Sequence, residues 1–184
     1  MQKHYCFSMK IFIVGYMGSG KTQTGYYISK KLEYNYIDTD AFIEKKYGEK
    51  ILQIFKTKGE DFFRKIEAES LRYISSNNQN IVISTGGGTP CFYNNMKYMN
   101  QKGITVYTKM SSKLLASRLY FNKEKRPLIS NINSIEDLEK FIQNHKKIRE
   151  RECYSYAQII ADMESISFDQ LFSIIKYTIW TKKK

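Results

Sequence analysis

An eight-residue stretch near the N-terminus carries the residue types that bind the phosphates of a nucleotide. Residues 15–22 read Gly-Tyr-Met-Gly-Ser-Gly-Lys-Thr, which is the spacing of a P-loop, and they follow an apolar run at 11–14. Glycines let the backbone curl so that successive N–H groups converge on one anion, and Lys21 is expected to reach the β- and γ-phosphates. A glycine-rich turn between a strand and a helix is the alternative, but the flanking segments favour phosphate binding. The expected nucleotide ligands here are Gly15, Gly18, Ser19, Gly20, Lys21 and Thr22.

Two carboxylates, Asp38 and Asp40, follow a second apolar segment at 34–37. We interpret this segment as a strand that ends in the two acidic residues. Doubly wound α/β proteins bind their ligands at the carboxyl ends of parallel strands. The two carboxylates are therefore candidates for a ligand site.

Three consecutive glycines, Gly86, Gly87 and Gly88, follow a third predicted strand at 81–84 after a single residue, Thr85. Glycine at such a position indicates that the backbone passes very close to another group. A flexible linker is the alternative, but a linker does not normally follow a buried strand so abruptly. We therefore predict a loop that faces a substrate.

The basic residues are unevenly divided between lysine and arginine. Only six of the 30 are arginine, in a chain with a net charge of +12. Because arginine offers a planar, bidentate fork, each arginine is a candidate anion ligand, with an ordinary surface residue as the alternative. The net charge could indicate nucleic-acid binding, but the lysines are scattered and the basic runs are short, which favours a solvated surface. The arginines are Arg64, Arg72, Arg118, Arg126, Arg149 and Arg151.

The elements that must position these residues alternate between strand and helix. This alternation predicts a single α/β domain over 1–184, with a short extension at 1–8 and a parallel sheet covered on both faces. On the helix predicted for 60–75, Arg64 and Glu67 stand three apart and can touch. Strands are predicted at 10–14, 34–37, 81–84, 104–107 and 157–161, and helices at 22–32, 41–47, 51–55, 60–75, 94–102, 113–120, 135–152 and 167–180.

Several classes of protein are disfavoured by the composition. No apolar run approaches the ~20 residues that span a bilayer, and the first eight residues lack the apolar core of a signal peptide, so we expect a cytoplasmic protein. The three cysteines, Cys6, Cys91 and Cys153, form no C-x-x-C pair. Neither a zinc site nor a disulfide framework is therefore expected.

With these motifs in this order, residues 9–179 resemble the shikimate kinases. The resemblance implies the fold of the nucleoside monophosphate kinases, with a five-stranded parallel sheet in the order 2-3-1-4-5. It also implies a substrate-binding region at about 40–76 and a lid at about 121–130. The family reaction converts ATP and shikimate into ADP and shikimate 3-phosphate, in aromatic amino-acid biosynthesis. The motifs are the P-loop, Asp38-Thr39-Asp40, Gly59-Glu60, Phe63-Arg64-Lys65-Ile66-Glu67, Gly86-Gly87-Gly88 and Arg126-Pro127-Leu128.

The same resemblance implies a role for each candidate residue. Asp40 is expected to accept the proton of the attacking hydroxyl, and Asp38 to hold Mg²⁺ together with Thr22. Lys21 and Arg126 are expected to neutralise charge on the transferring phosphoryl group, while Arg118 lies against the adenine. Arg64 is expected to bind the shikimate carboxylate, oriented by Glu67, and the amides of Gly86, Gly87 and Gly88 to approach the ring.

A second carboxylate-binding arginine is expected near residue 150, where both Arg149 and Arg151 are available. Neither has the tyrosine four residues later that the family shows. Counting back from Ala157 slightly favours Arg149, and Arg151 remains open. The expected partners are ATP and shikimate, with no nucleic acid and no membrane, and we expect a monomer.

Two other functions remain open at this point. One is another small-molecule kinase of the same fold, such as a gluconate or nucleoside monophosphate kinase. The other is a basic P-loop module that binds nucleic acid and has no enzymatic activity.

Overall fold

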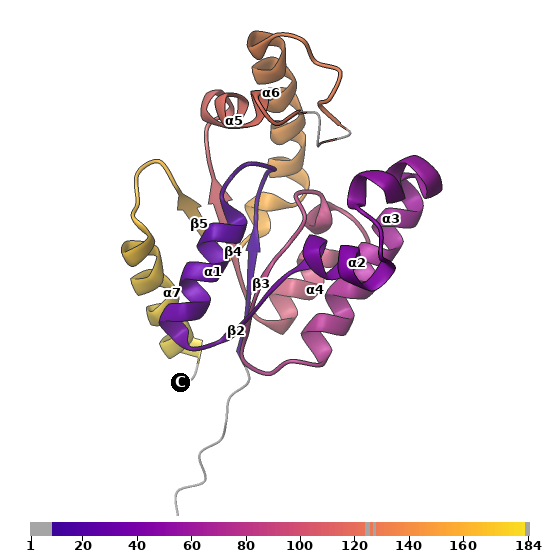
Figure 1. Ribbon diagram of the computed structural model, residues 1–184. Coiled ribbons are helices and arrows are strands. Elements are labelled where there is room, and N and C mark those ends of the chain that lie inside the picture. Colours follow the sequence, from indigo (N-terminus) through magenta and orange to yellow (C-terminus); the bar gives the residue numbers. More distant parts are fainter. Residues whose placement is uncertain (1–8, 124–125, 127, 183–184) are drawn as a thin grey trace, which may run out of the picture.

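A single parallel sheet forms the centre of the molecule (Figure 1). The computed structural model describes residues 9–123, 126 and 128–182. The strand order is β2-β3-β1-β4-β5, as predicted, and Ile11 of β1 pairs with Val82 of β3 on one side and Ile104 of β4 on the other. The strands are β1 (Lys10–Val14), β2 (Asn35–Asp38), β3 (Ile81–Ser84), β4 (Ile104–Lys109) and β5 (Ile159–Asp162).

The sequence of β1 explains its central place. After Lys10 the strand is continuously apolar and fully buried, which is typical of a parallel strand covered on both faces. Ile11 and Ile13 belong to one hydrophobic cluster, whereas Phe12 and Val14 belong to another. Alternate side chains therefore join the sheet to two different layers of helices.

Helices cover both faces of the sheet (Figure 1). On one face, α1 and α7 supply Ile28, Leu171 and Ile175 to the cluster around Ile11. On the other face, α3, α4, α5 and α6 contribute to the cluster around Phe12. These helices are α1 (Lys21–Leu32), α3 (Ile51–Ser76), α4 (Asn95–Lys102), α5 (Ser112–Tyr120), α6 (Ile135–Glu152) and α7 (Phe168–Lys182).

The region between β2 and β3 contains α2 (Thr39–Tyr47) and α3. Gly48 ends α2 in the left-handed conformation, with φ of 67°. The two helices predicted at 51–55 and 60–75 are assigned together as α3, but Gly59 interrupts it with φ of 80° and ψ of 171°. The break predicted near Gly59 is therefore present as a kink, because only glycine adopts this backbone conformation readily.

The first turn of α6 is capped by the serine that precedes it. The Ser134 hydroxyl accepts a hydrogen bond from the Asp137 amide at 3.0 Å. The helix then continues past Arg149 and Arg151 to Glu152. In the predicted lid, 124, 125 and 127 lie outside the described residues, as do Met1–Ser8.

The cysteine spacing predicted no disulfide framework, but one pair of cysteines is bonded. Cys91 and Cys153 are joined by a disulfide, with their Cα atoms 5.2 Å apart. The two residues are 62 positions apart, and the tertiary fold brings the short 3₁₀ helix η1 (Thr89–Cys91) against the end of α6. Such a contact has no signature in the local spacing of cysteines.

No helix in the described part of the chain is both long and apolar enough to cross a lipid bilayer.

Candidate active site

The P-loop has the backbone conformation that its glycines allow. Gly15, Gly18 and Gly20 have φ angles of 153°, 79° and 84°, which L-residues with side chains rarely adopt. Gly20 is the N-cap of α1 and has no side chain to cap it, so the N-terminus of α1 is open toward an anion. The ammonium group of Lys21 donates to the Tyr16 carbonyl at 2.8 Å, and this bond folds the lysine back over the loop.

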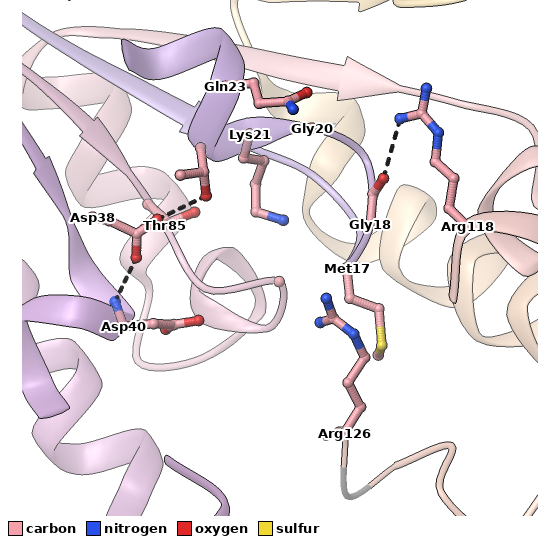
Figure 2. Close-up of a pocket in the computed structure, with 12 residues that line it drawn as sticks. Met17, Gly18, Gly20, Lys21, Gln23, Asp38, Asp40, Thr85, Arg118 and Arg126 are labelled. Atoms are coloured by element: carbon pink, nitrogen blue, oxygen red, sulfur yellow. Dashed lines mark hydrogen bonds between the residues drawn. The ribbon is translucent and has the colours of Figure 1, made fainter. Parts of the chain in front are cut away.

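Two further predicted nucleotide ligands, Ser19 and Arg118, make contacts between the P-loop and its neighbours β4 and α5. The buried Ser19 hydroxyl lies 2.7 Å from the Thr108 hydroxyl, so its side chain supports the loop from behind. Arg118 of α5 is exposed and lies at the edge of the loop, where Nη1 donates to the Gly18 carbonyl at 3.4 Å. The loop is thus held against β4 through Ser19, and Figure 2 shows Arg118 beside the loop at Gly18.

A pocket of about 570 Å³ lies over the P-loop. In Figure 2 the side chains of Lys21, Asp40 and Arg126 point from different sides into this space. Burial lowers the pKa of Lys21 to about 8, and the neighbouring Arg126 acts in the same direction while Asp40 opposes it. The pKa of Arg126 is also lowered by burial. A polyanion in this pocket would favour the charged form of Lys21 and so raise its pKa again.

Asp38 connects the P-loop helix with the acceptor side. One carboxylate oxygen, Oδ2, accepts from the Thr22 hydroxyl at 2.9 Å, and Oδ1 accepts from the Asp40 amide at 3.0 Å. Asp38 is therefore the N-cap of α2, and Asp40 lies in the first turn of that helix and not at the end of β2. The interpretation of both carboxylates as the end of the strand is therefore wrong for Asp40, because the helix predicted from residue 41 already begins at Thr39.

Thr22 and Asp38 form the candidate metal site. Their oxygens are the hard ligands that Mg²⁺ prefers, and Mg²⁺ usually takes one or two protein ligands together with phosphates and water. Among the residues that the structure describes, no group of three or more His, Cys, Asp or Glu could hold an ion by itself. The pair therefore fits a metal that arrives with a nucleotide.

Asp40 has an unusual environment for a carboxylate. Its Oδ1 is buried and makes no hydrogen bond. Burial raises the pKa of Asp40 to about 7, and the nearby Glu67 and Asp38 add to the shift. A carboxyl group with this pKa can exchange a proton near neutral pH.

A second pocket, of about 650 Å³, lies between α2, α3, the glycine loop and the end of α6. Arg64 is buried in its wall and donates from Nη1 to Glu67 at 2.9 Å, so the predicted contact between them is confirmed. Glu67 is fully buried, and its other oxygen accepts from the Thr89 hydroxyl at 2.6 Å. The guanidinium carbon of Arg64 also lies 4.4 Å from the centre of the Phe92 ring. These contacts hold the arginine fork in one orientation.

Two of the three glycines have very close neighbours in this wall. A Cβ on Gly86 would lie 2.5 Å from Glu67 Oε1, and one on Gly88 would lie 2.6 Å from the Arg64 guanidinium. The Gly86 amide donates to the Thr39 hydroxyl at 3.0 Å. The loop therefore approaches the Arg64–Glu67 pair closely, in addition to lining the pocket.

Only one of the two candidate arginines in α6 reaches the pocket. Arg149 is buried, lines the pocket and donates from Nη1 to the Gly87 carbonyl at 3.2 Å. The Arg151 side chain is 78% exposed and pairs with Glu152, its neighbour in sequence. Because residues two apart on a helix point about 200° away from each other, the helix can present only one of them to the pocket.

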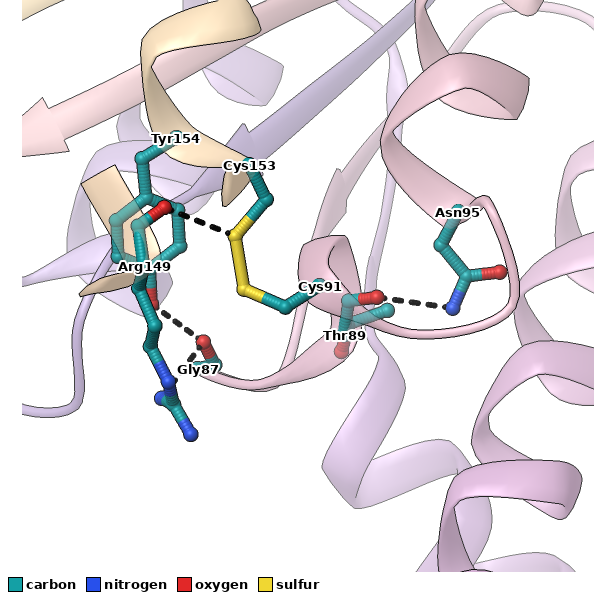
Figure 3. Close-up of a disulfide and its surroundings, with 7 residues drawn as sticks. All are labelled: Gly87, Thr89, Cys91, Asn95, Arg149, Cys153 and Tyr154. Carbon is teal, nitrogen blue, oxygen red and sulfur yellow. Dashed lines mark hydrogen bonds between the residues drawn. A yellow bond between two sulfur atoms is a disulfide. The ribbon is translucent and has the colours of Figure 1, made fainter. Parts of the chain in front are cut away.

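Several residues at the site were not predicted from sequence, and four of these contact Arg64, Glu67 or Gly87. Glu60 lies four positions before Arg64, so this pair could have been anticipated from helical spacing. Phe92 and Thr89 follow the glycine loop, and Tyr154 donates its hydroxyl to the Gly87 carbonyl (Figure 3). These last three depend on long-range packing, for which the sequence contains no local signal.

The two pockets meet. They share Asp40 and Arg126, together with Thr22 and Asp38, so a nucleotide and a second molecule would touch at this point.

A family model for shikimate kinase matches residues 17–178 of the 184. The chain belongs to the shikimate kinase family.

Individual shikimate kinases agree in sequence and in fold. The enzyme of Azobacteroides pseudotrichonymphae genomovar. CFP2 is 43% identical over 162 residues, which cover 88% of this chain and 94% of that protein. The crystal structure of shikimate kinase from Bacteroides thetaiotaomicron superposes with a TM-score of 0.83 at 32% identity, covering 93% of this chain and 98% of that one. Shikimate kinase from Acinetobacter baumannii, solved in complex with shikimate, has a TM-score of 0.82 at 30% identity and covers 96% and 95%.

Proposed function

We propose that this protein transfers the γ-phosphoryl group of ATP to the 3-hydroxyl of shikimate, giving shikimate 3-phosphate and ADP. The observation that carries the proposal is the junction of the two pockets at Asp40 and Arg126. In a kinase, the acceptor hydroxyl must lie next to the γ-phosphate, and proximity of this kind supplies much of the rate enhancement.

On the nucleotide side, the loop amides from Gly15 to Thr22 and the N-terminus of α1 would hold the phosphates. Lys21 and Arg126 would neutralise the charge that builds up on the transferring phosphoryl oxygens, and Arg118 would lie against the adenine. Thr22 and Asp38 would hold Mg²⁺, which supplies electrostatic stabilisation of the β- and γ-phosphates.

On the acceptor side, the carboxylate of shikimate would bind the guanidinium groups of Arg64 and Arg149. The backbone of Gly87 and Gly88 would lie against the ring. Asp40 would accept the proton of the attacking hydroxyl, for which its raised pKa is well matched. Glu67, held by Thr89, would keep Arg64 in position.

A coupled assay for ADP release tests this proposal, with shikimate, gluconate, AMP and CMP as acceptors in parallel. Turnover is expected with shikimate and should exceed that with the other three by at least about a hundredfold, because the pocket offers two arginines for a carboxylate and close contacts for hydroxyls. A nucleic-acid-binding module would instead show tight DNA or RNA binding with a steep salt dependence and no shikimate-stimulated ADP release.

Lys21→Ala serves as the control for this assay. It is expected to abolish phosphoryl transfer and to leave the circular dichroism spectrum unchanged, since Lys21 acts on the phosphates. Near-normal turnover in a folded Lys21→Ala variant would contradict the assignment. We further propose that the enzyme acts in the cytoplasm and that it is a monomer. Light scattering after gel filtration would check the monomeric state.

A further inference from the structure

The Cys91–Cys153 disulfide joins the two segments that form one side of the acceptor pocket (Figure 3). Cys91 ends the 3₁₀ helix that follows the glycine loop, and its amide donates to the Gly88 carbonyl at 3.0 Å. Cys153 directly follows α6, and its amide donates to the Arg149 carbonyl at 2.9 Å. Each cysteine is therefore bonded through its backbone to a residue that lines the pocket, Cys91 to Gly88 and Cys153 to Arg149.

The contact between these segments is centred on one carbonyl group. The Gly87 oxygen accepts hydrogen bonds from the Arg149 guanidinium, at 3.2 Å, and from the Tyr154 hydroxyl. A covalent bond beside this contact limits how far the loop and the end of α6 can separate. The orientation of Arg149 in the pocket thus depends on a contact that the disulfide reinforces.

The two cysteine residues differ in exposure. Cys153 is 1% exposed, whereas Cys91 is partly exposed and lines a further pocket of about 480 Å³. Asn94, Lys97 and Tyr156 also line this pocket, and it shares no lining residue with the two pockets of the active site. A small molecule could therefore reach Cys91 while ATP and shikimate are bound.

We propose that Cys91 and Cys153 form a reversible thiol–disulfide site, opened and closed by a small thiol acting at Cys91, and that the closed form lowers the KM for shikimate by holding Gly87 against Arg149. The effect on KM rests on the proposed acceptor site, whereas the thiol chemistry does not.

The exchange takes place in two balanced steps. The thiolate of one small thiol attacks the Cys91 sulfur, the bond to Cys153 breaks, and the Cys153 sulfur leaves with the electron pair and takes up a proton. The new thiol lies 3.1 Å from the Arg149 carbonyl, to which it can donate. A second small thiol, as its thiolate, attacks the small-thiol sulfur of the mixed disulfide. Cys91 is released and protonated, and the two small thiols are oxidised to their disulfide; closure is the reverse, with that disulfide as oxidant.

Labelling tests the site without reference to shikimate. In a Cys6→Ser background, Cys153→Ser leaves Cys91 as the single thiol, and Cys91→Ser leaves Cys153. Both variants are incubated with oxidised glutathione and followed by intact mass spectrometry. The Cys91 thiol is expected to gain one glutathione at least about ten times faster than the Cys153 thiol, since reactivity follows access. Equal rates, or faster labelling of Cys153, would overturn the assignment of Cys91 as the entry point.

Kinetics test the functional part. The Cys6→Ser enzyme is compared after oxidation and after reduction with dithiothreitol, with the thiol count checked in each state. Reduction is expected to expose two thiols and to raise the KM for shikimate about two- to tenfold, with the KM for ATP unchanged, because the loop must then be ordered by the substrate. The Cys91→Ser/Cys153→Ser double variant should have the higher KM under both conditions.

An unchanged KM for shikimate would overturn the functional part, as would a response that persists in the double variant. Two titratable thiols in the fully oxidised enzyme would overturn the disulfide itself. If neither state released ADP in response to shikimate, the proposed function would fail, and the labelling rates would still decide the thiol site.

Discussion

A single carboxylate oxygen of Glu60 accepts hydrogen bonds from both Nε and Nη2 of Arg64, at 3.1 Å and 3.0 Å. This is the edge of the guanidinium that a carboxylate ligand would otherwise bind as a fork. The Glu60 side chain is 45% exposed, whereas Glu67 on the other side of Arg64 is fully buried. Glu60 is thus the partner of Arg64 that can be displaced, and Glu67 is the one that stays.

Glu60→Gln is therefore expected to lower the KM for shikimate. Removal of the charge weakens the competition for Arg64 by roughly 0.2–1 kcal/mol, the range of exposed ion pairs, which corresponds to a KM lower by about 1.4- to fivefold. Steady-state kinetics at saturating ATP would measure it. Glu49→Gln, which removes the charge opposite Lys58 on the same stretch of chain, is the matched control and should leave the KM unchanged. A raised KM in Glu60→Gln would mean that Glu60 assists binding.

The two arginines near the end of α6 provide a matched pair. Arg149→Lys keeps the charge but removes the fork that faces the pocket, so the KM for shikimate should rise about tenfold to a hundredfold, or roughly 1.5–3 kcal/mol. Arg151→Lys makes the same change on the exposed side and should behave as the parent enzyme. The KM for ATP should be nearly unchanged in both. Equal effects of the two substitutions would be incompatible with the helical geometry described above.

The pH dependence of catalysis should report on Asp40. Because the pKa of this carboxyl is about 7, kcat/KM for shikimate is expected to fall with unit slope as the pH drops below about 7. In Asp40→Asn this fall of kcat/KM at low pH should disappear. Turnover should be about a hundredfold lower than in the parent enzyme, with ATP affinity little changed. Phosphoryl transfer through a loose transition state needs little help from a base, so the loss should lie at the low end of the range for base catalysis. A loss smaller than about threefold would assign Asp40 a structural role.

The same carboxyl should reduce the stability of the fold as the pH rises. An unfolded aspartate has a pKa of 3.8, and the folded value is about 7, so between these values the folded state binds more protons. The free energy of unfolding therefore falls as the pH increases from about 4 to 7. Urea denaturation at pH 5 and pH 7.5 should show that Asp40→Asn gains stability relative to the parent at the higher pH. Asp61→Asn, an exposed acid on α3, should show no such gain; a gain of similar size there would refute the explanation.

The segment 121–130 is expected to act as a lid over the nucleotide. Arg126 lines the pocket over the P-loop, and an arginine that closes over the phosphates must withdraw before products can leave. Hydrogen exchange with and without ADP would test this. Protection of the segment should increase on binding ADP, while α7, far from the pocket, should not change. Strong and equal protection in both states would contradict a lid.

Local sequence patterns were sufficient to predict most of the strands and helices. The apolar run of β1, the serine cap of α6 and the glycine that ends α2 each depend on residues within one turn or strand, so the sequence alone predicts them. The P-loop belongs to the same class, because its function resides in its own backbone.

Other features depend on residues that are distant in the sequence. The Cys91–Cys153 bond spans 62 positions, and the glycine loop needs its small residues partly because Glu67 and Arg64 lie behind it. The choice between Arg149 and Arg151 likewise required the direction in which α6 faces the sheet. Tertiary packing decides all three, and no local periodicity records it.

The kink at Gly59 allows the first part of α3 to fold back with α2 onto a small hydrophobic cluster of its own. Ile43, Ile54, Phe63 and Ile66 form this cluster, which is separate from the two clusters under the sheet. Arg64 and Glu67 lie on the turns that enclose it. Substitutions in this small core can therefore reshape the acceptor pocket while the packing beneath the P-loop is left intact. During evolution, a kinase of this architecture can therefore change its phosphoryl acceptor while its ATP-binding site is preserved.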